Sequence, residues 1–121
     1  MERTLIGNRA FLYCPGIISI VFPDSVTTIG NGAFLQCYGL RSVIISDSVT
    51  TIGKSAFYRC EHMTSVVIGR GVATIADGAF GECTSLNDVY YVGNDEDWKT
   101  ISIGESNDPL TDATIHYNYS A

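Results

Sequence analysis

The sequence lacks a long apolar run: no stretch approaches the ~20 consecutive apolar residues that a membrane-spanning helix needs. It also lacks an apolar leader, because Met1-Glu2-Arg3-Thr4 runs directly into patterned sequence. Hydrophobic residues nevertheless make up 45% of the 121 residues, too many for a disordered or fibrous chain. We therefore expect one folded domain of ordinary size with no membrane insertion.

Basic residues are scarce. Seven Lys and Arg stand against 13 Asp and Glu, and the net charge is −6. Residues 1–93 carry a balance of −1, from six basic and seven acidic groups, and residues 94–121 carry −5, from one basic and six acidic groups. A chain without a basic stripe repels phosphate, so we expect no nucleic-acid partner and no adsorption to anionic lipid.

Cysteine pairs with the close spacing of a metal site are missing. Zinc sites usually bring two ligands within about two to four residues of each other, whereas these four cysteines lie 23 residues apart. We expect reduced, buried thiols, because cysteine packs as a small hydrophobe. If the 23-residue spacing reflects coils stacked on one another, the Cα atoms of successive cysteines lie ~5 Å apart, within disulfide reach. Their side chains would then point in the same direction, which disfavours a bridge. The four are Cys14, Cys37, Cys60 and Cys83.

The same period of 23 residues governs two apolar residue types. Several residue types recurring in one register indicate a stack of coils, in which each coil buries its apolar residues only against its neighbours. The architecture therefore requires the phenylalanine rings of successive coils to touch. The series are Phe11, Phe34, Phe57 and Phe80, and Ile6, Ile29, Ile52 and Ile75.

Each coil contains one clear strand signal. In the segment 40–45, Val43 and Ile45 alternate with Ser42 and Ile44, which predicts a strand with Val43 and Ile45 inward and Ile44 outward. Strands that recur once per coil in the same direction pair in parallel. Pro23 lies where the strand of its coil should end, because it has no N–H for a ladder.

The rest of the coil predicts a second, weaker strand and a short helix. Val49-Thr-Thr-Ile52 favours an extended conformation because consecutive threonines are β-branched. Ala, Phe and Cys at relative positions one, two and five, as in Ala33-Phe34-Leu-Gln-Cys37, predict a helix of one to two turns. Asn31 or its equivalent Asp77 would serve as its N-cap.

The whole coil resembles the leucine-rich repeats, specifically the 23-residue BspA-like class. The run Val-Thr-x-Ile-Gly-x-x-Ala-Phe-x-x-Cys-x-x-Leu-x-x-Val-x-Ile spans residues 26–45 and recurs over 49–68 with Met63 at the Leu position. The resemblance covers about residues 4–92. It implies an α/β solenoid with a parallel sheet, a second short strand layer and short helices. Ser48 and Thr50 hold the places of the usual asparagine ladder, so we expect threonine, serine and backbone pairing to satisfy the turns.

We expect two parts: residues 1–92 as a leucine-rich repeat array of about four coils, the first incomplete, and residues 93–121 as a C-terminal cap. Trp98 and a final strand near Thr114–Tyr117 would cover the apolar end of the stack. Ile6 already occupies a mid-coil position, so we favour a fragment of a longer chain over a short protein with a ragged first coil.

Candidates for catalysis or metal binding are weak. His62 and His116 lie outside the repeat pattern and have no nucleophile with which to form a relay. Asp95, Glu96 and Asp97 have carboxylates suited to a hard cation, but the stretch lacks the rest of a calcium loop, so we expect a solvated acidic turn. We predict no catalytic residues, no cofactor and no metal site.

The outward side of the predicted strands is the best candidate for a binding surface. Ile44 and its equivalents form an apolar row, beside a row of polar residues, and solenoids commonly bind along this face. The alternative is that β-branched residues simply favour strands. The apolar row is Val21, Ile44, Val67 and Tyr90, and the polar row is Ser19, Ser42, Ser65 and Asp88.

The predicted function is a noncatalytic module for protein interaction or adhesion. The BspA-like resemblance implies a bacterial cell-surface or secreted protein, with an unidentified protein as its ligand. The alternative is a structural spacer or self-associating module that pairs end to end through the uncovered N-terminal coil, where Ile6, Phe11 and Cys14 would be exposed. An enzyme is the weakest option.

Overall fold

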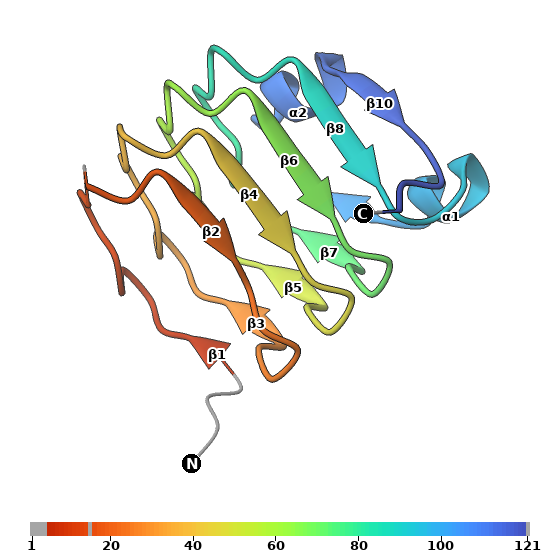
Figure 1. Cartoon of the computed structure of the whole chain (residues 1–121), viewed down its shortest axis with the longest axis horizontal. Helices are drawn as coiled ribbons and strands as arrows, with labels where there is room; N and C mark the ends of the chain where they lie inside the picture. The colour runs from red at the N-terminus through yellow and green to blue at the C-terminus, as the bar shows by residue number, and fades with distance from the viewer. Residues whose placement is uncertain (1–4, 15, 121) are drawn as a thin grey trace.

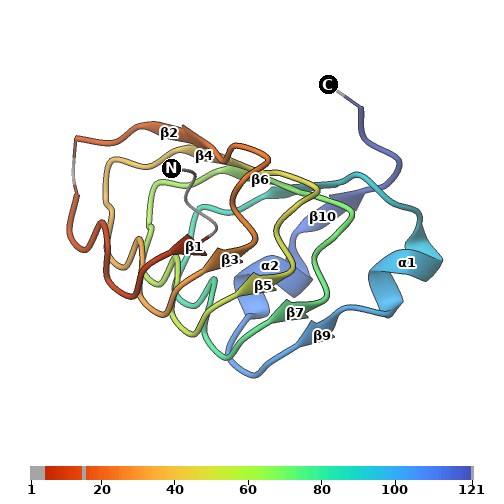
Figure 2. The same cartoon turned by 90° about the horizontal axis from the view of Figure 1, so that it is seen from below.

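The structure is a computed structural model that describes residues 5–14 and 16–120. These residues form two parallel five-stranded sheets on opposite sides of a stack of coils (Figures 1 and 2). The front sheet consists of β2 (Ser19–Val21), β4 (Ser42–Ile45), β6 (Ser65–Ile68), β8 (Asp88–Tyr91) and β10 (Thr114–His116). The rear sheet consists of β1 (Leu5–Ile6), β3 (Thr28–Ile29), β5 (Thr51–Ile52), β7 (Thr74–Ile75) and β9 (Ser102–Ile103). The helices are α1 (Asp95–Lys99) and α2 (Asp108–Asp112).

Strand register follows the sequence repeat. Each residue of β4 pairs with the residue 23 positions later in β6, as Val43 does with Val66. Val43 and Ile45 are buried, each with 1% of its surface exposed, and Ile44 between them is 40% exposed. The predicted solenoid, its parallel strands, and their inward and outward sides are confirmed.

The core lies between the two sheets and contains the phenylalanine ladder. The ring centroids of Phe11 and Phe34 are 5.0 Å apart, those of Phe34 and Phe57 are 5.4 Å apart, and those of Phe57 and Phe80 are 5.3 Å apart. The rings are stacked nearly parallel, as the repeat predicted. Phe11 is 38% exposed because the ladder ends there among the described residues.

The cysteines form a second ladder of free thiols. Each thiol in the inner coils donates a hydrogen bond to a phenylalanine carbonyl 26 residues earlier, as Cys60 does to Phe34 at 3.2 Å. The equivalent distances are 3.1 Å from Cys37 to Phe11 and 3.0 Å from Cys83 to Phe57. These three thiols are therefore structural donors to the preceding coil, and they are free and buried as predicted. Cys14 is free but only half-buried, because it lies in the first coil.

The helices predicted over the Ala-Phe segments are wrong. Residues 31–36 form successive turns, and Gly32 and Gln36 have φ values of 63° and 57°, in the left-handed region that a helix excludes. Backbone N–H groups here alternate between a carbonyl three residues back and a carbonyl of the next coil. Phe34, for example, donates to Ala56 at 2.7 Å. The described helices lie only in the C-terminal part of the chain.

Asn31 is not a helix cap but a link between coils. Its Oδ1 accepts a hydrogen bond from the N–H of Lys54 in the next coil at 2.8 Å. Gly53 makes this approach feasible, because a Cβ there would lie 2.6 Å from that oxygen. Elsewhere in the coil, the Ser48 hydroxyl donates to the Val26 carbonyl at 2.7 Å. The expectation that serine and threonine satisfy the turns is confirmed at this position.

The C-terminal segment extends both sheets after an insertion. Ile103 pairs with Ile75, 28 residues earlier, so the coil is longer by five residues than the repeat. The insertion contains α1, where Trp98 packs edge-on against Tyr91 with ring centroids 5.1 Å apart. Asn107 is buried, and its Oδ1 accepts the Phe80 N–H at 2.9 Å. The predicted final strand is confirmed as β10, beside β8.

Candidate protein-binding face

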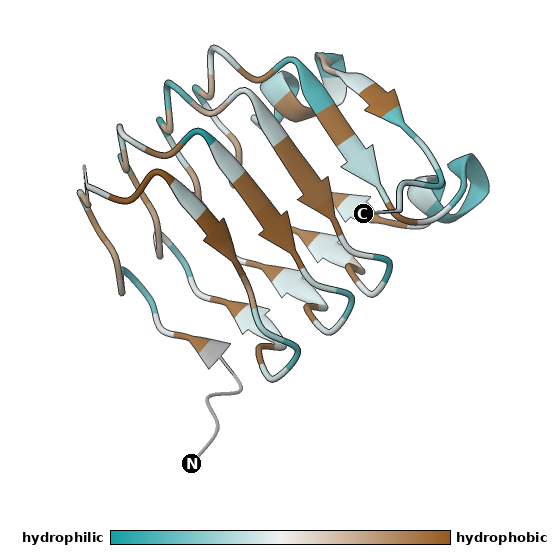
Figure 3. Cartoon of the chain, viewed as in Figure 1, coloured by the Kyte–Doolittle hydropathy of each residue, from teal (hydrophilic) through white to brown (hydrophobic). Residues whose placement is uncertain are grey.

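The apolar row predicted from the sequence lies on the open side of the front sheet. Its members are in register on adjacent strands, from Val21 on β2 to Tyr90 on β8. Val21 is 67% exposed and Ile44 40% exposed, whereas Val67 and Tyr90 are half-buried. Figure 3 shows the apolar bands on β2, β4 and β6. The structure thus brings the four residues together in one continuous row.

The predicted polar row runs alongside it. Ser19 is exposed, and Ser42, Ser65 and Asp88 are half-buried. Register pairs these residues strand by strand and ends on Thr114 of β10. A partner lying across the strands would therefore contact apolar side chains on one row and hydroxyls on the next.

The rear sheet differs sharply on its outward side. Its register row begins at Leu5 on β1, and from β3 to β9 it holds only hydroxyl residues, each of them exposed or half-buried. Threonine is β-branched and suits a strand as well as valine does. Strand preference is therefore satisfied without exposed apolar residues in the outward row of β3, β5, β7 and β9. The hydroxyl residues of the row are Thr28, Thr51, Thr74 and Ser102.

An aromatic cluster closes the apolar row at β8. The ring of Tyr90 stacks on His116 with centroids 4.6 Å apart, and Tyr119 lies 5.1 Å from Tyr90. His116 is fixed by Asp88, whose Oδ1 lies 2.9 Å from His116 Nε2. Asn118 turns the chain back with a φ of 57°, and its N–H donates to the Gly93 carbonyl at 2.9 Å.

A pocket of about 360 Å³ lies between this cluster and the ends of β4 and β6. Ile44 and Val67 of the apolar row line it, and Tyr119 lines it from the C-terminal segment. Two exposed carboxylates, Asp24 and Asp47, also line it, and the lining contains no basic residue. The front face therefore combines the apolar row, the ring of Tyr119, which we call the aromatic wall, and the two negative charges of Asp24 and Asp47.

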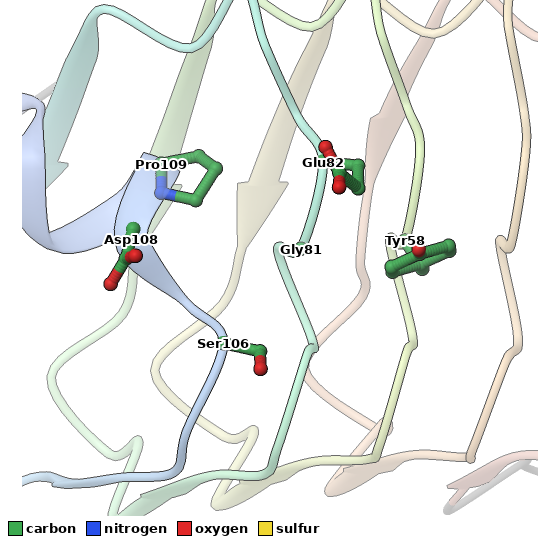
Figure 4. A pocket seen from close by; sticks show the side chains of 6 residues that line it. All are labelled: Tyr58, Gly81, Glu82, Ser106, Asp108 and Pro109. Atoms are coloured by element: carbon green, nitrogen blue, oxygen red, sulfur yellow. The ribbon is translucent and has the colours of Figure 1, made fainter.

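Two other pockets lie elsewhere, and the second of them shares Ser19 and Val21 with the edge of the front face. One of about 440 Å³ is on the turn side of the coils, lined by Tyr58, Glu82 and Asp108 among others (Figure 4). Another of about 370 Å³ is at the open N-terminal end, where Phe11 and Ile20 contribute to an apolar lining. The first is lined by the hydroxyls of Tyr58 and Ser106 and by the carboxylates of Glu82 and Asp108, and the second has a single polar side chain, Ser19.

Titratable groups do not converge on a reactive site in the described residues. Burial raises the pKa of the Cys83 thiol to about 12, which keeps it protonated and weakly nucleophilic. Within residues 5–14 and 16–120, no three His, Cys, Asp or Glu side chains lie close enough together to hold a metal ion. Asp95 and Asp97, expected in a solvated acidic turn, lie in the first turn of α1, where Asn94 and Asp97 form a capping box. The described helices are too short to cross a membrane.

The repeat unit decides the family. The family described as BspA type Leucine rich repeat region matches residues 4–118 in six copies. The chain belongs to the BspA-type leucine-rich repeat family. The match extends past residue 92 into the irregular C-terminal segment, consistent with β9 and β10 extending the two sheets.

Two solved leucine-rich repeat structures are similar to this BspA-type chain. The T. pallidum Leucine Rich Repeat protein (TpLRR) has a TM-score of 0.70 and 32% identity, over 83% of this chain and 44% of that one. A leucine rich cell surface protein from Faecalibacterium prausnitzii A2-165 has a TM-score of 0.65 and 31% identity, over 82% of this chain and 32% of that one. The chain thus spans less than half the length of each. No curated protein matches it.

The sequence identified the two rows but missed three residues of the BspA-type front face. Asp24 and Asp47 are equivalent turn residues one coil apart, so their meeting beside the apolar row could have been inferred from the period. Tyr119 could not, because it lies beyond the last regular repeat and reaches Tyr90 only through the turn at Asn118.

Proposed function

We propose that the chain is a noncatalytic module for protein interaction or adhesion in a bacterial surface or secreted protein, and that it binds through the front face. Leucine-rich repeat modules generally bind proteins along a face of this kind. Support for the surface location comes from a similar protein described as a cell surface protein. Residues 93–121 act as the cap that ends the stack in this proposal.

One observation carries the choice of face. The front sheet exposes Val21 and Ile44 in its outward row, whereas β3, β5, β7 and β9 of the rear sheet carry hydroxyl residues in theirs. Exposed apolar rows cost solubility, and contiguous ones mark interaction sites. Because threonine would serve the strand equally well, the apolar choice points to a partner rather than to strand preference.

The test changes polarity without changing shape. In the variant with Ile44→Thr and Val67→Thr, both side chains stay β-branched, so the fold should persist with an unchanged melting temperature. Peptides selected from a random display library on the native protein should lose binding to this variant. They should still bind a control with Thr51→Val and Thr74→Val, which alters the rear sheet in the opposite sense. Equal binding to both variants would reject the front face.

Self-association is the second candidate, and the N-terminal pocket favours it. Phe11 and Phe34 end the phenylalanine ladder there, beside Ile17 and Ile20, in a largely apolar cavity of about 370 Å³. A second copy seated on this end would bury the exposed ring of Phe11. Sedimentation should then show a dimer that Phe11→Ser abolishes and Ile44→Thr leaves intact. A monomer at all concentrations tested would end this proposal.

A further inference from the structure

The pocket beside Tyr119 carries a more specific inference about the partner, which rests on the proposed binding function of the front face. Its lining combines apolar or aromatic side chains with two negatively charged ones. Ile44, Val67 and Tyr119 are apolar or aromatic, whereas Asp24 and Asp47 are exposed carboxylates. A ligand group that fits this pocket must have an apolar part for the first set of side chains and a part that pairs with the carboxylates.

The two carboxylates occupy equivalent positions in successive coils, and the third position of this series is Arg70. The Arg70 side chain is engaged elsewhere, because its guanidinium lies 3.3 Å from Asp97 Oδ2 in α1. Asp47 is held in place, since its Oδ1 accepts the Arg70 N–H at 2.8 Å. The pocket rim therefore carries negative charge and no basic lining residue to balance it.

The aromatic wall is held in place by the backbone. The Tyr119 N–H donates to the Tyr91 carbonyl at 2.9 Å, and the Tyr119 ring lies against Tyr90. An aromatic ring beside carboxylates attracts a cation over its face. An aliphatic floor formed by Ile44 and Val67 suits the methylene stem that carries such a cation.

We propose that this pocket takes an arginine or lysine side chain from an extended segment of a protein partner, whose neighbouring apolar residues lie along the row of Ile44 and Val67. The stem contacts the apolar floor, and the charged head lies between Tyr119 and the carboxylates of Asp24 and Asp47. An acidic segment is repelled by these carboxylates, and a wholly apolar segment would strip them of water without compensation.

The probe is a fluorescein-labelled pentapeptide, Val-Arg-Val-Arg-Val, with glutamine and glutamate versions as matched peptides. Fluorescence anisotropy measures binding to the whole chain at about 50 mM and about 500 mM salt. The arginine peptide should bind, more weakly at the higher salt. The glutamine and glutamate peptides should bind at least about tenfold more weakly. Failure of the arginine peptide to bind, or equal binding of the glutamine peptide, overturns the proposal.

The variant with Asp24→Asn and Asp47→Asn should lower the affinity for the arginine peptide about tenfold. Its fold should persist, because asparagine Oδ1 still accepts the Arg70 N–H. The control carries Asp77→Asn and Asp112→Asn, which make the same change in net charge away from this pocket. Asp77 Oδ1 likewise accepts a backbone N–H, from Glu105 at 2.9 Å. Equal losses in the two variants would show non-specific attraction and contradict the proposal.

The two proposals fail in different ways. The first outcome is that the Ile44→Thr and Val67→Thr variant loses the display-selected peptides, while the Asp24→Asn and Asp47→Asn variant keeps full affinity for the arginine peptide. In that case the proposed site for a basic side chain is wrong and the proposed binding face stands. If the Ile44→Thr and Val67→Thr variant keeps the selected peptides, the binding face itself is wrong.

Discussion

At the scale of single residues, successive coils are joined by a hydrogen bond from a backbone N–H to the side-chain oxygen of an asparagine or aspartate in the preceding coil. A glycine of the next coil lies against that oxygen. Asn8 Oδ1 accepts the Asn31 N–H at 2.8 Å and lies beneath Gly30, and Asn31 stands in the same relation to Gly53. Lys54 has no side-chain acceptor, and the residue above it is Ala76 rather than glycine. The glycine is thus present where an acceptor oxygen approaches from the preceding coil.

Gly53→Ala should lower the free energy of unfolding by about 1–3 kcal/mol, because its Cβ would overpack the coil interface. That atom would lie 2.6 Å from Asn31 Oδ1 and 2.7 Å from the Asn31 nitrogen. Gly7 occupies the same repeat position, and a Cβ added there would meet no atom within 4 Å, so Gly7→Ala is the matched control and should cost nothing. Urea unfolding of both variants decides the point; equal effects would remove the role assigned to Gly53.

The cysteine ladder should make stability fall in alkali. Burial raises the pKa of Cys83 to about 12 and also raises that of Cys60. An unfolded thiol loses its proton near about pH 8.5, so above this pH the unfolded chain releases protons that the folded chain retains. The stabilisation of the fold by these protonated thiols is therefore fully present below about pH 8.5. It is lost progressively as the pH rises toward about 12.

The comparison is between the native chain and a variant with Cys60→Ala and Cys83→Ala. Urea unfolding at about pH 8 and about pH 10 should show a shallower loss of stability in the variant, by up to ~1.4 kcal/mol per pH unit for each thiol removed. The other residues are identical in the two chains, so their contribution to the pH dependence cancels. Identical slopes would mean that the thiols are not protected by burial.

At the scale of elements, the front strands were predictable and the turn segments were not. Val43 and Ile45 are buried and alternate with the half-buried Ser42 and the exposed Ile44, and this period of two identifies a strand without knowledge of its neighbours. The segment around Phe34 places its apolar residues at helical spacing, yet its N–H groups bond to the next coil. The left-handed conformation of Gln36 depends on those inter-coil bonds, which local sequence does not reveal.

The phenylalanine ladder should contribute unequally along its length. Phe57 is fully buried between two rings, so Phe57→Ala should cost about 3–5 kcal/mol in unfolding free energy. Phe11 stacks on one ring only and is 38% exposed, so Phe11→Ala should cost less than about half as much. Guanidinium unfolding gives both values. A larger loss for Phe11 than for Phe57 would contradict the order of the stack.

At the scale of the whole molecule, the repeat predicted the stack of coils and the two rows of the front face, because each follows from a fixed period. The C-terminal segment departs from that period. Its five-residue insertion shifts the pairing partner of Ile75 from Trp98 to Ile103, and it leaves Trp98 in α1 against Tyr91. The aromatic wall at Tyr119, and with it the pocket, therefore came only from the structure.

The most direct test of the account is to map a bound peptide on the whole chain by amide NMR. With the display-selected peptide added, we expect the largest shift changes in β4, β6 and β8 and in residues 118–120, because these surround the apolar row and the pocket. Changes confined to the rear-sheet strands β3, β5 and β7, or to the turn segments on the opposite side of each coil, such as residues 31–36, would contradict it.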